Sequence, residues 1–482
     1  MRTRNCWMLL TVTVTVSARL QVPAQDWETV DDFAPVGGNA QAHGVAVDPA
    51  GHIYVVGTAD GHGIVRYSAD DGSNWITRDD FLYESASNTV FNAVTVDRNG
   101  AVFVGGAAGL SWIGHWLVRR SADQGVSWNT VDDYFVPRNF PEEGTNAVVY
   151  SLSSDDQGRV YGAGTMLRTG PSYPFWLVRG SGIGGTNWET KLTLFSGYHE
   201  VSELTCAGEA VYVTGAIDAS YDGGDGLILR SSDQGATWTT NFEAVGEVHS
   251  AITADPGGAI YTAGAHWITS TSIVWLVRRS GPGGTNWTTL DTLLYNQTDA
   301  AGVDSPFPNS IAVDNRGNVC VAGQFTDYWV IDLTNGMMYG ADTTWSTRQY
   351  VAAADQWVTT DLFSYSTNRQ GAALGTAIAP SGSLFVAGYG TSDTGQQRWV
   401  VRRQVSRLTP FRIQIARAGT SGMVSWPATD TNWVLQWTAS LDVNPDWQNF
   451  TGTVSVVDGH KLAAVELTGE RRFFRLNRTS SP

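Results

Sequence analysis

One short motif returns along the chain and constrains the fold more than any other feature. Its clearest copy is Ser-Ala-Asp-Gln-Gly-Val-Ser-Trp, from Ser121 to Trp128, and copies beginning at Ser68 and Ser231 keep the spacing Ser-x-Asp-x-Gly-x-x-Trp. The Asp suits a tight turn because its carboxylate bonds to nearby backbone N–H groups, and the Gly accepts a positive φ. The Trp buries a large ring beside the turn. We therefore interpret these Asp residues as turn builders and not as catalytic groups.

A second element precedes each motif. It consists of an apolar strand, an Asp-x-x-Gly turn and another apolar strand that ends in Gly, as in residues 45–57. These closing glycines lie about 49 to 65 residues apart, close to the period of four-stranded propeller blades; they are Gly57, Gly106, Gly164, Gly215, Gly264, Gly323 and Gly388. A variable loop, a third strand that usually ends in Arg, and a Trp-led fourth strand follow each of the first six. The spacing predicts seven four-stranded units.

The seventh unit lacks its own fourth strand. It ends at residues 399–403, and no Trp-led strand follows. The missing piece stands at the other end of the chain, because residues 26–33 (Asp-Trp-Glu-Thr-Val-Asp-Asp-Phe) closely match residues 127–134 (Ser-Trp-Asn-Thr-Val-Asp-Asp-Tyr). Pairing the N-terminal strand with the last unit would close a ring and remove a free sheet edge. We predict an all-β chain: a seven-bladed β-propeller closed by the N-terminal strand in residues 25–408, then a small C-terminal β-sandwich in residues 409–482.

Both elements are similar to known repeats. The Ser-x-Asp-x-Gly-x-x-Trp runs resemble the Asp-box, or BNR, repeat of β-propellers, and units such as residues 44–57 resemble the SBBP β-propeller repeat of secreted bacterial proteins. Residues 435–441 and the terminal Phe-Phe-Arg-Leu at 473–476 resemble a small module on exported proteins of planctomycete- and verrucomicrobia-type bacteria. The resemblances imply a fold and say little about function, because propellers host many functions.

Residues 1–24 are typical of a secretory signal peptide. Arg2 and Arg4 precede an apolar run at residues 7–16, and small residues suited to cleavage follow. The apolar run is too short to span a bilayer, so we expect an exported protein, secreted or in the cell envelope, with no membrane span. The formal net charge of −16 argues against nucleic acid as a partner. We expect no cofactor, since neither a phosphate loop nor zinc spacing is recognisable.

A ring of polar residues is the first candidate site. Counting five residues back from each turn Asp, or its equivalent, predicts the start of every inner strand at His43, Asn92, Tyr150, Glu200, Ser250, Asn309 and Leu374. Six of these seven are polar in strands that are otherwise apolar. The pattern indicates either a polar channel mouth that holds a ligand or ion, or a channel lined for water, and the residues alone leave both open.

Loops at the same end supply further candidates. Trp112, Trp267 and Trp329 follow closing glycines, while Tyr221 and Asp222 lie in the Asp/Gly-rich stretch 218–226. Aromatic rings stack on sugar faces and carboxylates bond to hydroxyl groups, which favours a carbohydrate; simple packing on the rim is the alternative. The stretch 218–226 offers oxygen ligands for Ca²⁺ without matching an EF-hand, so metal binding stays open.

Three functions remain in view. We predict a non-catalytic protein that binds a glycan or protein ligand at the loop-rich face, outside the cytoplasm. The alternative is a glycoside hydrolase of the sialidase-like Asp-box propeller type, although the arginine triad, Tyr nucleophile and Arg-Ile/Leu-Pro motif of sialidases are not recognisable. Such an enzyme could use Glu200 with Asp222 or Asp225, at a separation that decides its chemistry. A scaffold attached through the C-terminal module is a third hypothesis.

Overall fold

The computed structural model describes residues 27–478 apart from 86–87, 111–112, 136–144, 169–173, 196–200, 218–223, 270–271, 295–304, 333–336, 352–355, 367–369, 405–413, 419–420, 428–432, 439–446, 458–459 and 467–472. The chain divides into two compact units, Met1–Val405 and Ser406–Pro482. The described residues are mainly β-strand, with one 3₁₀ turn at Tyr83–Ser85. Among them, no helix has the length and apolar character needed to cross a membrane. The predicted signal segment lies outside the described residues.

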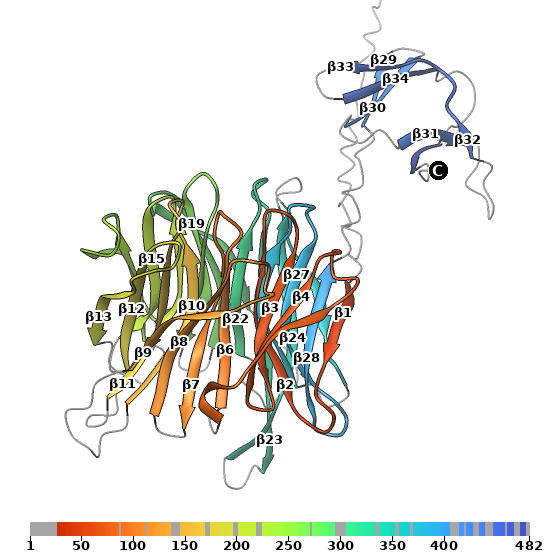
Figure 1. Ribbon diagram of the computed structural model, residues 1–482. Helices are drawn as coiled ribbons and strands as arrows, with labels where there is room; N and C mark the ends of the chain where they lie inside the picture. Colours follow the sequence, from red (N-terminus) through yellow and green to blue (C-terminus); the bar gives the residue numbers. More distant parts are fainter. Residues whose placement is uncertain are drawn as a thin grey trace, which may run out of the picture. The chain divides into compact units, whose positions relative to one another are not determined.

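The first unit consists of small antiparallel sheets, which we number as seven groups of four strands (Figure 1). Group 1 is β2 (Ala40–Val47), β3 (Ile53–Ala59), β4 (His62–Ser68) and β5 (Ile76–Phe81). Group 2 is β6 (Asn88–Val96), β7 (Val102–Leu110), β8 (Ile113–Ser121) and β9 (Asn129–Tyr134). Group 3 is β10 (Thr145–Ser154), β11 (Arg159–Arg168), β12 (Pro174–Ile183) and β13 (Glu189–Phe195).

Groups 4 to 6 follow the same order along the chain, and group 7 takes its outer strand from the beginning of the chain. Group 4 is β14 (Val201–Ala207), β15 (Ala210–Ile217), β16 (Asp225–Ser231) and β17 (Thr239–Val245). Group 5 is β18 (Glu247–Ala254), β19 (Ala259–Thr269), β20 (Ser272–Pro282) and β21 (Thr285–Leu294). Group 6 is β22 (Ser305–Val313), β23 (Val319–Asp332), β24 (Met337–Val351) and β25 (Gln356–Phe363). Group 7 is β26 (Gly371–Ile378), β27 (Leu384–Thr391), β28 (Gln397–Gln404) and β1 (Trp27–Phe33).

Strand β1, from the beginning of the chain, forms the outer edge of the last sheet. It runs antiparallel to β28, with Thr29 opposite Arg402 and Phe33 opposite Trp399. The first strands of successive groups contact one another in the order β2, β6, β10, β14, β18, β22 and β26, and β26 in turn contacts β2. Groups 2 and 3 also share one ladder pair, Asn146 with Gly114, which joins them into one eight-stranded sheet. The innermost strands therefore form a closed cycle of contacts.

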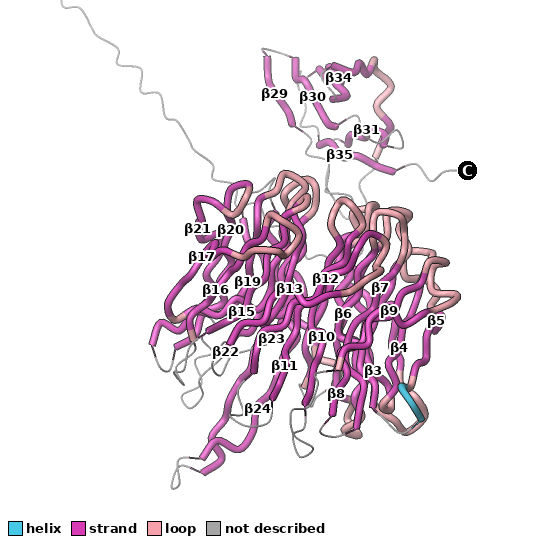
Figure 2. Tube along the Cα trace, turned by 60° about the vertical axis from the view of Figure 1, so that its left-hand side comes forward, coloured by secondary structure: helices cyan, strands magenta, loops and turns pink. Residues whose placement is uncertain are grey.

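The sheets of neighbouring groups lie side by side (Figure 2), and the core of this unit lies between them. Trp116 of group 2 packs in one cluster with Val149 and Leu177 of group 3. Trp399 of group 7 packs in another with Val55 of group 1. Five third-strand tryptophans are fully buried in this way: Trp116, Trp176, Trp275, Trp345 and Trp399. Each group is thus a thin sheet whose faces are covered by the sheets beside it, which is the arrangement that two-sided apolar strands require.

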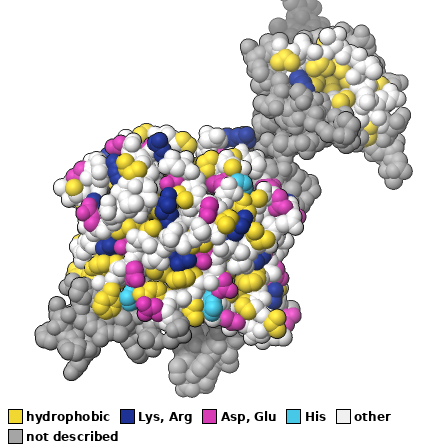
Figure 3. Space-filling model, viewed as in Figure 1, with side chains coloured by type: hydrophobic (Ala, Val, Ile, Leu, Met, Phe, Trp, Pro, Cys, Tyr) yellow, Lys and Arg dark blue, Asp and Glu magenta, His cyan; other side chains and the backbone are white. Residues whose placement is uncertain are grey.

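Ion pairs also join neighbouring groups. Six third strands carry an Arg at one equivalent position, opposite a Thr of the outer strand. Five of these donate to an Asp on the outer strand of the preceding group: Arg66 to Asp31, Arg119 to Asp79, Arg179 to Asp132, Arg348 to Asp291, and Arg402 to Asp361. Arg278 of group 5 instead pairs with Glu247 on its own first strand. Each of the six also donates to a Thr on its own group's outer strand. Elsewhere on the surface shown in Figure 3, basic and acidic side chains are interspersed.

Every innermost strand bulges opposite a closing glycine. In β10, for example, the pairing shifts between Val149 and Ser151, so that Tyr150 is the extra residue and Val149 faces Gly164. A Cβ at Gly164 would lie 1.8 Å from the Val148 carbonyl oxygen, far closer than any side chain allows. This steric limit explains why the strand that faces the bulge ends its apolar run in Gly.

The repeated motif forms the turn predicted for it. The Asp123 carboxylate accepts a hydrogen bond from the Ser127 amide at 2.9 Å, and Gly125 has a φ of 84°. The Trp128 indole N–H donates to the Gly125 carbonyl at 3.0 Å. Hydrogen bonds to Asp123 from the Ser127 hydroxyl, the Ser127 amide and the Ser121 hydroxyl lower the pKa of this carboxyl to about 2. These interactions are local, so the turn needs the Asp for its own structure.

The second unit contains two small sheets. One has the order β29-β30-β34-β33 and the other β32-β31-β35. Their strands are β29 (Gln414–Ala418), β30 (Ser421–Pro427), β31 (Trp433–Thr438), β32 (Gln448–Asn449), β33 (Val454–Val457), β34 (His460–Glu466) and β35 (Phe473–Arg478). Trp426 of the first sheet and Leu435 of the second belong to one buried cluster, with Phe450 and Phe474 against it. The two sheets therefore share a core.

Candidate functional site

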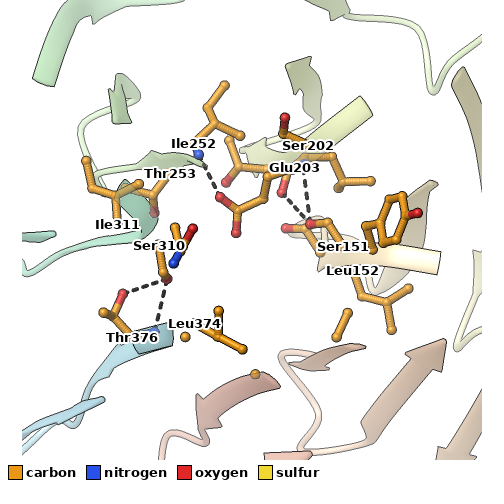
Figure 4. Close-up of a pocket in the computed structure, with 18 of the residues that line it drawn as sticks. Ser151, Leu152, Ser202, Glu203, Ile252, Thr253, Ser310, Ile311, Leu374 and Thr376 are labelled. Carbon is orange, nitrogen blue, oxygen red and sulfur yellow. Dashed lines mark hydrogen bonds between the residues drawn. The ribbon is translucent and has the colours of Figure 1, made fainter. Parts of the chain in front are cut away.

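A cavity of about 300 Å³ lies where the seven innermost strands meet (Figure 4). All seven contribute to its lining, which comes from residues 43–45, 92–94, 150–153, 202–205, 250, 252–253, 309–313 and 374–376. In each strand this stretch begins at the bulge residue and continues toward the turn into the second strand. The cavity is therefore built by the same position of each repeat.

The predicted polar ring is largely brought together here. His43, Asn92, Tyr150, Ser250, Asn309 and Leu374 all line the cavity. They lie at the bulges, within the strands, and not at the strand starts where the sequence placed them. The lining extends from them toward the Asp-turn end of the strands, whereas the sequence placed the ligand at the loop-rich end.

Group 4 is where the predicted ring and the cavity differ. Glu200 lies outside the described residues, and the bulge position of β14 is occupied by Ser202, between Val201 and Glu203. The count missed it because β14 and β15 are joined by a two-residue turn, with Ala207 opposite Ala210, in place of the longer Asp-x-x-Gly turn. Ser202 and Glu203 are thus lining residues that the sequence did not single out.

Several ring side chains are engaged in joining the strands. Asn92 donates to the Val149 carbonyl at 2.9 Å, and Asn309 donates to the Ala373 carbonyl at 2.9 Å. The His43 Nδ1 lies 3.0 Å from the Phe91 carbonyl, and Ser250 donates to the Pro308 carbonyl. In each case the acceptor immediately precedes the bulge of the next innermost strand. These polar residues therefore have a structural role, beyond lining a channel for water or ligand.

The next position along each strand forms a second belt. Ser151 accepts a hydrogen bond from the Leu204 amide at 3.1 Å, and Ser310 accepts one from the Thr376 amide at 3.0 Å. Glu203 does the same for the Ile252 amide, at 2.7 Å. The remaining strands have small residues here: Gly44, Ala93, Ala251 and Gly375. A carboxylic acid therefore stands where every other strand has Gly, Ala or Ser.

Glu203 is the unusual group in this cavity. Its side chain reaches into the space from β14, with Leu374 and Thr376 on the far side (Figure 4). Enclosure among the strands raises the pKa of this carboxyl to about 8, since the one hydrogen bond from Ile252 only partly offsets the loss of water. The cavity lining contains no Lys or Arg to balance its charge. Among the lining residues, Glu203 is also the only carboxylic acid.

The cavity has two unlike sides. Strands β10, β14 and β18 contribute a concentration of hydroxyl groups: Ser151, Ser153, Ser202, Thr205, Ser250 and Thr253. Strands β2, β6 and β26 contribute one hydroxyl group, that of Thr376, and two glycines. Glu203 belongs to the hydroxyl-rich side. The accessible lining as a whole is predominantly polar, so a bound molecule would meet mostly hydrogen-bonding groups.

Trp267, the loop aromatic candidate whose side chain is described, is not part of this lining. Trp267 is half-buried on β19, opposite Ile273, beyond the closing Gly264. Trp329 lies in β23, but its side chain is outside the description, and Trp112, Tyr221 and Asp222 lie outside the described residues altogether. Asp225 begins β16 and accepts a hydrogen bond from the Gly246 amide at 3.1 Å. The carboxylate pair suggested for a hydrolase, Glu200 with Asp222 or Asp225, therefore stays a hypothesis.

The described residues contain no group of three or more His, Cys, Asp or Glu side chains placed to hold a metal ion. The stretch 218–226, considered for Ca²⁺, lies mostly outside those residues. Cys206 and Cys320 are free thiols in groups 4 and 6, and burial raises the pKa of Cys206 to about 12. Neither thiol is poised as a nucleophile, because the reactive form is the thiolate.

Comparison with known proteins gives solved structures only. No family profile matches the chain, and no curated protein sequence matches it. An oligogalacturonate lyase in complex with manganese aligns over 80% of this chain and 97% of its own, with 10% identity and a TM-score of 0.49. An α-L-arabinanase from Penicillium chrysogenum aligns over 66% and 94%, with 13% identity and a TM-score of 0.41. The Hadza microbial sialidase Hz136 aligns over 59% and 63%, with 15% identity and a TM-score of 0.41.

Proposed function

We propose that this chain is an extracytoplasmic, non-catalytic binding protein for a carbohydrate ligand. In this proposal the seven groups are the blades of a seven-bladed β-propeller that β1 closes, and the second unit is a small β-sandwich. The signal-like residues 1–24 support export. A binding protein needs a preformed concave site, and the fold supplies one at the axis.

One observation carries the proposal: the axial cavity is preformed, and the lining that a ligand could reach is predominantly polar and rich in hydroxyl groups. Its side chains are held by hydrogen bonds between neighbouring strands, as Asn92 and Asn309 show. A sugar presents several hydroxyl groups, so it matches such a lining. Because the polar groups are fixed before binding, little conformational entropy would be lost. The loop-rich face remains the proposed site for a larger glycan or protein.

The second candidate is a glycoside hydrolase. Glycosidases need two carboxyl groups about 5 to 9.5 Å apart. The described cavity lining offers one, Glu203, which favours binding over hydrolysis at this position. A catalytic pair at the loop-rich face would involve Glu200 with Asp222 or Asp225, and of these three the structure describes only Asp225.

A glycan array with the purified mature chain, residues 25–482, tests the proposal directly. We expect saturable binding to a limited set of glycans and no release of chromophore from a panel of chromogenic glycosides. Turnover of any glycoside would favour the hydrolase. A blank array together with a silent panel would refute both carbohydrate functions.

A further inference from the structure

We propose that the axial cavity takes an amino sugar, a small ligand that carries a primary ammonium group together with hydroxyl groups, and that Glu203 holds the ammonium group. The proposal rests on the proposed carbohydrate function and narrows it to a ligand class. It places the specificity-determining residue in β14, at a position that the sequence did not single out.

The position of Glu203 shows that its charge is not needed for the fold. Ser151 in β10 and Ser310 in β22 stand at the same place in their strands and accept the same backbone hydrogen bond from the next group. A hydroxyl group is therefore enough to join two strands here, and Gly or Ala is also accepted in other groups. Glu203 does this with one oxygen, which receives the Ile252 amide. The longer side chain and the second oxygen serve some other purpose.

The surroundings of that carboxyl favour a cation. Neither Lys nor Arg lines the cavity, and the other titratable lining residues are His43 and Tyr150. Burial lowers the pKa of His43, which keeps its ring neutral. Glu203 is partly buried, and a carboxylate shielded from water without a counter-ion is costly, so the group keeps its proton until a positive charge arrives. An anionic ligand would find no partner among these residues, whereas an ammonium group would supply the missing charge.

The size and the rest of the lining favour a small hydroxylated molecule. A cavity of about 300 Å³ is at the lower end of ligand pockets and suits a single sugar ring. An ammonium group has three N–H donors. Glu203 can accept one of them, and the hydroxyl groups of Ser202 and Thr253 lie on the same side of the cavity. Leu374, across the cavity from Glu203, would contact C–H groups of the ring.

Binding of this kind is coupled to a proton. The pKa of Glu203 is about 8, so this carboxyl is mostly protonated in the free protein at pH 7. An ammonium ligand stabilises the ionised form, so binding at pH 7 displaces a proton from Glu203 to the buffer. A neutral sugar has no such effect. Calorimetry in buffers of different ionisation enthalpy measures the number of protons released.

The test uses the mature chain with glucosamine, glucose and N-acetylglucosamine at pH 7, by calorimetry and thermal shift. We expect glucosamine to bind at least tenfold more tightly than either neutral sugar and to release close to one proton. Glu203→Gln keeps the shape and an oxygen acceptor for Ile252, and should lose the preference and the proton release. Glu203→Ser copies the residue of β10 and β22, and provides a second variant if the Gln variant does not fold.

Three results would overturn the inference. Equal binding of the three sugars without proton release would show that the carboxyl recognises no ammonium group, while carbohydrate binding itself would stand. Unchanged glucosamine affinity in both Glu203 variants would place the ammonium site elsewhere. If the glycan array is positive and no monosaccharide stabilises the chain, the ligand binds outside the cavity; a blank array as well would remove the proposed function too.

Discussion

Neighbouring sheets are joined by different chemistry at two successive boundaries. An ion pair lies between groups 2 and 3, and an apolar contact lies at the same position between groups 3 and 4. At the first, Arg179 of β12 donates to Asp132 of β9 through two nitrogens, at 2.7 and 2.8 Å, and both side chains are buried. At the second, Leu229 takes the position of the Arg, because it faces Thr240 as Arg179 faces Thr190. Leu192 takes the position of the Asp. Both leucines belong to one apolar cluster.

The comparison shows that the two positions change together within one chain. Where the Arg is replaced by Leu, the Asp of the preceding group is replaced too, and no unpaired charge is left in the boundary. The boundary between groups 4 and 5 differs again. There the Asp position is Phe242, and Arg278 turns to Glu247 of its own group. Breaking one side of a buried pair costs far more than exchanging the whole pair for apolar groups, and the predictions below test this rule.

The largest effect is expected from removing a whole strand at one boundary. Deletion of residues 25–34 takes away β1, and with it the Asp31 partner of Arg66 and the Phe33 contact to Trp399. We expect a loss of at least 5 kcal/mol, from the unpaired charge together with the exposed core. Thermal melting should fall by about 10 °C or more. A chain ending at residue 405 is the control, and equal melting of the truncated and full chains would contradict the closure by β1.

Breaking the Arg179–Asp132 pair on one side comes next. Arg179→Leu leaves a buried carboxylate without its partner, and we expect a loss of about 3 kcal/mol at pH 7 in urea unfolding. Burial already raises the pKa of Asp132, so the loss should shrink toward pH 4 as the group keeps its proton. The double variant Arg179→Leu with Asp132→Leu copies the neighbouring boundary and should recover most of the stability. A double variant as unstable as the single one would show that the two boundaries are not equivalent.

At the boundary between groups 4 and 5, protonation of His249 should lower the stability of the folded chain at acidic pH. This ring is 1% exposed, its Nε2 has no hydrogen-bond partner among the described residues, and burial lowers its pKa to about 4 despite Glu247 at 3.7 Å. The unfolded chain binds this proton first, so stability should fall as the pH drops from about 6.5 to about 4, by at most about 3 kcal/mol. His249→Leu should flatten this part of the pH profile, measured by urea unfolding. An unchanged slope would mean that other groups dominate.

The smallest effect is expected when an ion pair is introduced at the apolar boundary between groups 3 and 4. Leu192→Asp with Leu229→Arg copies the boundary between groups 2 and 3, and the double variant should differ from the parent by about 1 kcal/mol. Each single change should cost more, because it buries one charge alone. The coupling energy from a double-mutant cycle measures the difference. Additive costs would show that the two side chains do not meet.

The sequence predicts much of this architecture because repetition is visible in it. The closing glycines fall one to each group, on the second strand, and the match between residues 26–33 and 127–134 points to the edge strand that pairs with β28. The local turn geometry of Asp123 and Gly125 also follows from residue type alone. These features depend on neighbours in sequence, which is why a single chain reveals them.

The cavity and the boundaries were harder to predict, for a physical reason. The Arg–Asp pairs connect strands of different groups, so they depend on how sheets pack and not on spacing within a repeat. Glu203 was missed because the short turn after β14 shifts the count, and only the bulge register aligns it with Ser151 and Ser310. In that alignment Glu203 is the one acidic residue at a position that otherwise holds Gly, Ala or Ser, and this difference could have identified it from the sequence. The residues predicted at the loop-rich end lie mostly outside the description.

The pairing of β1 with β28 has a consequence for biogenesis. Trp27 faces Gln404, so β1, the first strand that the structure describes, can reach its partner only after nearly the whole first unit has been synthesised. Until then β1 has no strand to pair with, and contacts of such high sequence separation form late and slowly. A nascent chain of this kind would benefit from a chaperone that shields its leading end.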